Sequence, residues 1–261
     1  MSEPLLSIHD LTISLQEEGG ERILLKRFNL KVDPFKIVAL VGLSGSGKTT
    51  VALSVLRLLS EVFEIEEGQI LFQKANLLSL GPQEMRRLRG KAMGMVFQEP
   101  LNAFNPVFPV GFQIGEVLRV HTSLSYQKIR TRIIQLLEMV GIPDPPRVMQ
   151  SFPHQLSGGL RQRAMIAQAI AAGPSLIIAD EPTSNLDVTL QAHIMDLFRH
   201  LKETLKISIL LITHDLGVVS HLADEVAVLS EGEIIESGPT SEILSHPRHP
   251  FTRELLGTFL E

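Results

Sequence analysis

The stretch with the clearest chemical capacity is Gly-Leu-Ser-Gly-Ser-Gly-Lys-Thr at residues 42–49, a glycine followed by four residues and then Gly-Lys-Thr. Glycines in such a loop let backbone N–H groups point inward without a clash from a Cβ atom. N–H groups at the start of a helix attract phosphate oxygens. Lys48 can reach terminal phosphates as a point charge, and the hydroxyl of Thr49 can bind Mg²⁺, which takes few protein ligands. The residues expected to bind nucleotide here are Gly42, Ser44, Gly45, Ser46, Gly47, Lys48, Thr49 and Thr50.

This loop can act in that way only if a strand delivers it and a helix follows it. Residues 37–41 are apolar and rich in strand-forming types, and residues 50–59 have the apolar spacing of a helix. The alternative is a Gly- and Ser-rich turn that binds nothing. The predicted strand, loop and helix favour nucleotide binding over that alternative.

A second group of candidate residues follows the apolar run 176–179, which is a predicted core strand. A carboxylate at the carboxyl end of such a strand lies where ligands bind in parallel α/β sheets. Asp180 is therefore expected to hold Mg²⁺, directly or through water, opposite Thr49. Glu181 is placed to orient or deprotonate an attacking water.

Two further polar residues end predicted strands. Gln98 follows the apolar run 92–97, and we expect it to contact the metal and the attacking water. His214 follows the strand predicted at 207–212 and is a candidate donor to the γ-phosphate. The alternatives are an ordinary loop glutamine and a histidine that only satisfies its structural neighbours.

Residues 156–163, Leu-Ser-Gly-Gly-Leu-Arg-Gln-Arg, predict a second helix start suited to an anion. Ser157 is the expected N-cap, Gly158 and Gly159 lie in the first turn, and the helix is expected to run to Ala172. Two such loops in one compact chain would not grip the same nucleotide. We therefore expect this loop to close on a nucleotide bound to another copy or to a paralogue.

Composition excludes several classes of function. The 261 residues carry a net charge of −5 and contain no cysteine, so thiolate metal sites, iron–sulfur clusters and disulfides are excluded. The acidic balance argues against nucleic acid as a partner. No stretch reaches the roughly 20 apolar residues that a spanning helix needs, so any membrane role is expected to come through a partner.

The remaining pattern predicts one integrated α/β domain over residues 1–261. Strands are expected at 6–15, 23–32, 37–41, 69–72, 92–97, 176–179, 207–212, 226–229 and 233–236, with a turn at 66–68. Residues 99–171 are expected to form a helical insertion that opens with a loop at 99–106, and four prolines between 143 and 153 interrupt its later part. Helices are also expected at 82–88, 188–205 and 250–260.

The order of these motifs resembles the ATP-binding-cassette ATPases. In that family they correspond to the Walker A loop, the Q-loop, the signature, Walker B with its catalytic glutamate, the D-loop and the H-switch. The matching residues in this chain are 42–49, Gln98, 156–159, Asp180 with Glu181, 184–187 ending at Asp187, and His214.

The resemblance implies a phosphate-loop NTPase core, RecA-like with a mostly parallel sheet, joined by an antiparallel β subdomain and a helical subdomain. It also implies a head-to-tail dimer with two ATP molecules, each held between Walker A of one subunit and the signature of the other. ATP and Mg²⁺ are the implied cofactors. Residues 97–106 and the tail at 240–261, including 246–256, resemble the importer ATPases for oligopeptides, dipeptides and nickel.

The resemblance therefore implies an ATP-hydrolysing subunit that drives uptake of peptides or nickel-type solutes. The implied partners are two integral membrane permeases, a paralogous ATPase in a heterodimer, with a homodimer as the alternative, and indirectly an extracytoplasmic solute-binding protein. The implied location is peripheral, on the cytoplasmic face of the cell membrane. The alternatives are an exporter ATPase, and a soluble protein of this family acting on nucleic acid. One departure concerns Leu15, which stands about where the family often stacks an aromatic residue on adenine.

Overall fold

A computed structural model describes residues 3–17, 20–184 and 186–257. Its central six-stranded sheet has the order β10-β9-β3-β8-β7-β6, and every neighbouring pair is parallel except β10 with β9. The mostly parallel core is therefore confirmed. The strands are β3 (Ile37–Val41), β6 (Met93–Val96), β7 (Leu176–Asp180), β8 (Ser208–Thr213), β9 (Glu225–Ser230) and β10 (Glu233–Pro239).

Strand β3 is buried on both faces, as expected where helices or a second sheet cover a parallel sheet. Ile37, Ala39 and Val41 join one hydrophobic cluster, whereas Val38 and Leu40 join the other. The alternation fixes the strand between two cores. The phosphate loop that follows Val41 thus starts from a rigid point.

A second sheet is antiparallel, with the order β2-β1-β4-β5. The turn predicted at 66–68 is wrong, because β4 runs straight through it. Gly68 has a φ of +107°, and a Cβ there would lie 2.6 Å from the Cα of Leu11. This glycine permits a close approach of β4 to β1 at an irregular register, not a chain reversal. The strands are β1 (Leu6–Glu17), β2 (Gly20–Val32), β4 (Phe63–Phe72) and β5 (Ala75–Asn76).

The helix after the phosphate loop is shorter than the sequence predicts. Helix α1 spans Lys48–Val55, and the chain leaves it at Arg57, which has a φ of +50°. Leu56 and Leu59 still pack on the core outside a helix, whereas Leu58 is exposed. Helix α2 (Pro82–Leu88) follows a short 3₁₀ turn at Leu77–Ser79 and has the predicted bounds.

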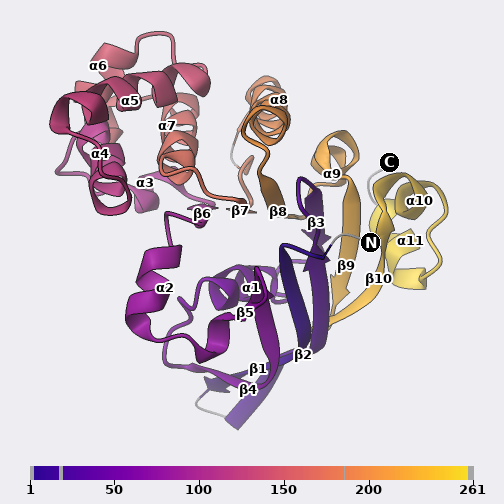
Figure 1. Ribbon diagram of the computed structural model, residues 1–261. Coiled ribbons are helices and arrows are strands. Elements are labelled where there is room, and N and C mark those ends of the chain that lie inside the picture. Colours follow the sequence, from indigo (N-terminus) through magenta and orange to yellow (C-terminus); the bar gives the residue numbers. More distant parts are fainter. Residues whose placement is uncertain (1–2, 18–19, 185, 258–261) are drawn as a thin grey trace.

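All residues between Val96 and Leu176 are described, and the elements there are helical. They gather beyond the β6 side of the parallel sheet (Figure 1). The expected loop at 99–106 contains a short helix, and Pro145 starts another because the Asp144 side chain accepts a hydrogen bond from the Arg147 N–H. The helices are α3 (Pro100–Ala103), α4 (Val110–His121), α5 (Tyr126–Met139), α6 (Pro145–Gln150) and α7 (Gly158–Ile170), with a 3₁₀ turn at Pro153–Gln155.

The remaining helices follow β7, β8 and β10 in the chain. Helix α8 has the predicted bounds, and α11 starts at the predicted residue and is described to Gly257. Helices α9 and α10 were not expected from the sequence. Among the described residues, no helix combines the length and apolar character needed to cross a membrane. The bounds are α8 (Val188–Leu205), α9 (Leu216–Leu222), α10 (Thr240–Ser245) and α11 (Pro250–Gly257).

Candidate nucleotide-binding site

A cleft of about 370 Å³ lies at the carboxyl ends of β3 and β7, which are separated by β8 in the parallel sheet. This is the edge at which parallel α/β sheets bind ligands. The cleft brings together the phosphate loop, Gln98 and the paired carboxylates, the first and last of which are more than 130 residues apart in the chain. Its lining residues are Leu24, Ser44, Gly45, Gly47, Lys48, Thr49, Thr50, Phe63, Gln98, Asp180 and Glu181.

The phosphate loop has the backbone that its glycines predict. Gly45 and Gly47 have φ values of +80° and +102°, which disfavour other residues. Gly47 is the N-cap of α1, and no side chain caps that helix, so its first N–H groups remain available to an anion. Gly42 does not line the cleft, because it packs against β9, where a Cβ would collide with the carbonyl oxygen of Leu229.

Lys48 is buried, with 7% of its surface exposed, and its ammonium group is held inside the loop. The Nζ atom donates to the carbonyl oxygens of Gly42 and Leu43, both at 2.8 Å. Burial lowers the pKa of Lys48, and the nearby carboxylates of Glu181 and Asp180 oppose that shift. The cation thus already lies among the groups that would meet phosphate.

Asp180 ends β7 and is 4% exposed. Its Oδ1 atom is buried and has no hydrogen-bond partner among the described residues. Burial raises the pKa of Asp180, although a hydrogen bond with Thr49 acts in the opposite direction. An unsatisfied buried carboxylate oxygen beside a threonine hydroxyl fits a hard cation such as Mg²⁺, which prefers oxygen ligands and few protein groups. The buried hydroxyl oxygen of Ser46 is likewise unpaired within the described part of the chain.

Glu181 and His214 form a pair that the sequence did not predict. Glu181 has a φ of +47° and is 9% exposed. Its Oε1 atom lies 2.7 Å from Nδ1 of His214, and the hydroxyl of Thr213 donates to Oε2 at 3.4 Å. His214, a candidate donor to the γ-phosphate, contacts the candidate base and is not among the residues that line the cleft. Left-handed backbone at a non-glycine residue is a feature of constrained functional sites.

The residues expected to act on a second subunit's nucleotide lie outside this cleft. Ser157 caps α7, and its hydroxyl accepts from the N–H of Leu160 at 3.4 Å. Gly158 faces open space, and Gly159 packs on Leu190 at the start of α8. Asp187 is the N-cap of α8, and its Oδ1 accepts from the Leu190 N–H at 3.0 Å. Asn185, in the predicted D-loop, lies outside the described residues.

Sequence reasoning missed two apolar residues in the cleft wall, Leu24 and Phe63. Leu15, which the resemblance places near the base, is not among the lining residues. It is the cross-strand partner of Phe63 on the neighbouring strand. Only the register of β1 with β4 brings an aromatic ring to this position, and no local pattern around residue 63 signals it.

The fold and this cleft define the chain as a phosphate-loop nucleotide-binding ATPase. A family model described as "ABC transporter" matches residues 25–184, and a second, described as "AAA domain, putative AbiEii toxin, Type IV TA system", matches 152–220. The chain belongs to the ABC transporter family, as an ATP-binding and ATP-hydrolysing cassette.

Curated relatives agree with this assignment. The oligopeptide transport ATP-binding protein OppD of Bacillus subtilis (strain 168) is 45% identical over 97% of this chain and 71% of its own length. A putative peptide import ATP-binding protein of Brucella ovis is 45% identical over 97% of this chain and 77% of its own length. The peptidoglycan transport ATP-binding protein YejF of Agrobacterium fabrum is 42% identical over 98% of this chain and 47% of its own length.

Solved structures show the same cassette architecture. A dimeric post-hydrolysis state of the ATP-binding cassette MJ0796 bound to ADP and Pi superposes with a TM-score of 0.81 at 26% identity, covering 90% of this chain and 98% of that one. The cbiO1 protein of Clostridium perfringens, part of the transporter complex cbiONQ, superposes with a TM-score of 0.80 at 27% identity, covering 94% and 92%.

Proposed function

We propose that this chain is the ATP-hydrolysing subunit of an importer that takes up peptides. The observation that carries the proposal is the cleft in which Lys48, Asp180 and Glu181 converge. The names of the relatives, oligopeptide transport and peptide import, support peptides as the solute class. Nickel-type solutes remain a prediction of the sequence that none of the relatives described above supports by name.

The residues in and beside the cleft each have a defined task in this proposal. The backbone N–H groups at the start of α1 and the ammonium of Lys48 bind the phosphates. Thr49, Asp180 and Gln98 would hold Mg²⁺, which neutralises charge on the phosphate oxygens when bound. Glu181 accepts the proton of the attacking water, and His214 holds the carboxylate in place through its 2.7 Å contact.

Phe63 and Leu24 would hold the base. They are the apolar side chains in a cleft wall that is otherwise glycine, polar or charged. Aromatic rings stack on nucleobases with a contribution of about 1–3 kcal/mol per base. Phe63 is partly buried against the core, so the ring is supported from behind.

The signature residues would act across a subunit interface. Ser157, Gly158 and Gly159 start α7 outside the cleft of their own chain, so a second ATPase subunit has to bring its nucleotide to them. Asp187 starts the neighbouring helix and would meet the same interface. A paralogous partner giving a heterodimer is our proposal, and a homodimer is the alternative.

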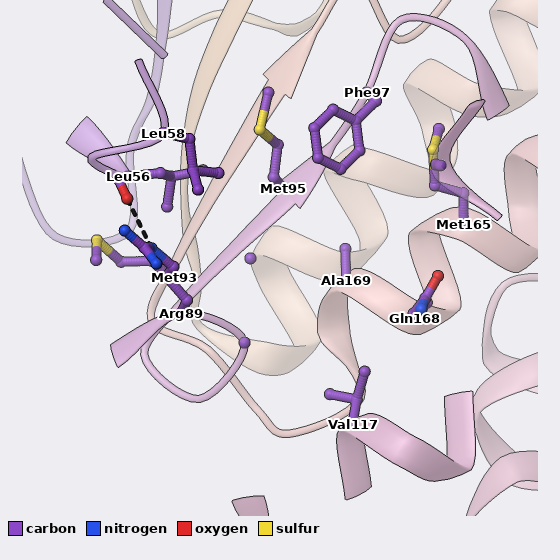
Figure 2. Close-up of a pocket in the computed structure, with 13 residues that line it drawn as sticks. Leu56, Leu58, Arg89, Met93, Met95, Phe97, Val117, Met165, Gln168 and Ala169 are labelled. Atoms are coloured by element: carbon purple, nitrogen blue, oxygen red, sulfur yellow. Dashed lines mark hydrogen bonds between the residues drawn. The ribbon is translucent and has the colours of Figure 1, made fainter. Parts of the chain in front are cut away.

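A groove of about 230 Å³ would receive the membrane permeases (Figure 2). Phe97, which lines it, is 39% exposed, and Leu101, two residues before the lining residue Ala103, is 47% exposed. One wall, β6, leads directly to Gln98 in the cleft. Two permeases with a solute-binding protein outside, and a peripheral position on the cytoplasmic face of the membrane, complete the proposed assembly. Residues 1–261 would act as one cassette, with the helical insertion at 99–171 and the tail at 240–261.

The Glu181→Gln variant tests the enzymatic part of this proposal. The amide keeps the shape of the side chain but cannot accept the water's proton, so we expect nucleotide binding to persist and turnover to fall by about 10²–10⁴-fold. Lys48→Ala should instead lose nucleotide binding, because it removes the buried ammonium group. ATP turnover beside calorimetric nucleotide binding separates the two effects. Normal turnover by Glu181→Gln would refute the assigned base.

Purification of the tagged chain from its native membrane tests the importer. We expect two permeases and a second ATPase to co-purify with it. We also expect a peptide-specific binding protein to be encoded beside them. A complex with only this ATPase and the permeases would refute the heterodimer. A binding protein specific for nickel would refute the peptide assignment.

A further inference from the structure

Arg89 is a cation in the wall of the groove described above, at the end of α2. The nearby Arg86 and Arg87 are exposed. The guanidinium of Arg89 instead turns inward: Nε donates to the carbonyl oxygen of Leu56 at 2.7 Å, and a terminal nitrogen donates to that of Arg57 at 2.8 Å. Figure 2 shows the contact with Leu56 at the edge of the groove. Burial lowers the pKa of Arg89.

Those two carbonyl groups lie immediately after α1, the helix that begins at the phosphate loop. The C-terminal carbonyls of a helix lack partners within the helix and carry the negative end of its dipole. The chain is reversed there by Arg57 at φ +50°, and the N–H of Leu58 donates back to the carbonyl of Leu53 at 2.8 Å. The fork of Arg89 closes this turn from outside.

The groove also contains residues from elements far away in the chain. Its lining joins the α1 end, the connection from α2 to β6, β6 itself and the helical insertion, with Val117 and Met165 among the insertion's contributions. An apolar segment seated there would cover Arg89 and exclude water from its two hydrogen bonds. Such bonds strengthen when the local dielectric constant falls.

We propose that Arg89 is a positioning residue that couples occupancy of the groove to the phosphate loop through the C-terminal end of α1. Helix α1 has only eight residues, about 12 Å in length, so it moves as one rigid body between the groove and Lys48. By linkage, nucleotide binding at the start of α1 and binding of a partner in the groove change each other's binding free energy by the same amount. This inference rests on the proposed nucleotide site and adds a connection that is separate from Gln98.

A tryptophan reporter tests the coupling in the full chain. The protein contains no tryptophan, and Leu58, which lines the groove and is 43% exposed, can be replaced as Leu58→Trp. Adding a non-hydrolysable ATP analogue with Mg²⁺ should shift the emission of this tryptophan. Adding Arg89→Met should remove most of the shift, because the two hydrogen bonds that join the groove wall to the end of α1 are lost. Calorimetry should show that both proteins still bind the analogue.

Matched variants distinguish positioning from a merely structural role. Arg86→Met, on the exposed side of the same helix, should leave the shift unchanged, and Arg89→Lys should restore part of it because an ammonium can reach one carbonyl but lacks the fork. A full shift in Arg89→Met, or in Arg89→Lys if the Met variant fails to fold by circular dichroism, would overturn the coupling. Lack of analogue binding by the Leu58→Trp protein and by the wild type would overturn the nucleotide site itself, and the inference with it.

Discussion

At the scale of single residues, the site holds a buried charge that the free protein does not fully satisfy. Asp180 is 4% exposed, its Oδ1 has no partner among the described residues, and burial raises its pKa. A group that is unfavourable in the folded state and poised for a ligand is typical of a functional site. Stability and binding should therefore respond in opposite directions when this carboxylate is removed.

We expect Asp180→Asn to raise the free energy of unfolding of the nucleotide-free protein at neutral pH by about 1 kcal/mol, the scale of one desolvated polar group. The gain should shrink as the pH falls from neutrality toward the ordinary carboxyl pKa of 3.8, because a raised folded-state pKa means that wild-type Asp180 takes up its proton first in the folded protein. Denaturant titrations at several pH values measure this. Addition of ATP with Mg²⁺ should stabilise the wild type and not the variant, and a destabilised variant at neutral pH would contradict the argument.

Phe63 provides the second residue-scale prediction. Phe63→Ala should weaken ATP binding about 5- to 150-fold, which corresponds to the loss of one stacked base. Binding of inorganic tripolyphosphate should stay the same, because its contacts are with the phosphate loop. Leu15→Ala is the matched control on the neighbouring strand and should change neither affinity. Equal weakening of ATP and tripolyphosphate by Phe63→Ala would show that the ring supports the loop and does not bind the base.

At the scale of elements, the sequence predicted those helix and strand bounds that depend on residues close together in the chain. The bounds of β3, α2 and α8 follow from apolar spacing and, for α2, a proline at its start. The sequence carried a start signal for α9 as well, since the Asp215 side chain caps that helix by accepting from two N–H groups. The turn predicted at 66–68 failed because Gly68 is used for close packing against β1, which only the tertiary pairing reveals.

The residues of the candidate site also fall into those that the sequence predicted and those that it did not. The phosphate loop, Asp180, Glu181 and Gln98 were predictable because strand ends and glycine spacing place them. Phe63 and the contact between Glu181 and His214 were not, since both depend on which strands become neighbours. The inward contact of Arg89 has no local signal, because the nearby Arg86 and Arg87 are exposed and the end of α1 that Arg89 meets lies more than 30 residues earlier.

The start of α7 carries the prediction at this scale. Ser157→Arg places a bulky cation at a helix start that we expect to face the partner's nucleotide. ATP-driven dimerisation, measured by light scattering with Glu181→Gln as the background, should be lost. Nucleotide affinity of the monomer should be preserved, because Ser157 lies outside the cleft of its own chain. Ser151→Arg, upstream in the same helical insertion, is the control and should dimerise normally.

At the scale of the whole molecule, the parallel sheet lies between two groups of helices. Helices that would contact the permeases gather on the β6 side, and α10 and α11 lie on the β10 side (Figure 1). The nucleotide cleft lies between them, at the carboxyl ends of the central strands. A signal from the membrane partner therefore has two short routes to the phosphates, along β6 to Gln98 and along α1 to Lys48.

The hydrogen bonds of Lys48 to two carbonyl groups have a consequence for the entropy of ligand binding. Nζ donates to the carbonyl oxygens of Gly42 and Leu43, so two of the three donors of the ammonium group fix its position inside the loop. Ordering a lysine side chain costs up to about 2 kcal/mol of rotamer entropy. Here that ordering is already present before a ligand arrives, and the third donor is left to meet a phosphate oxygen. The free loop is thus preorganised for the phosphates of a nucleotide.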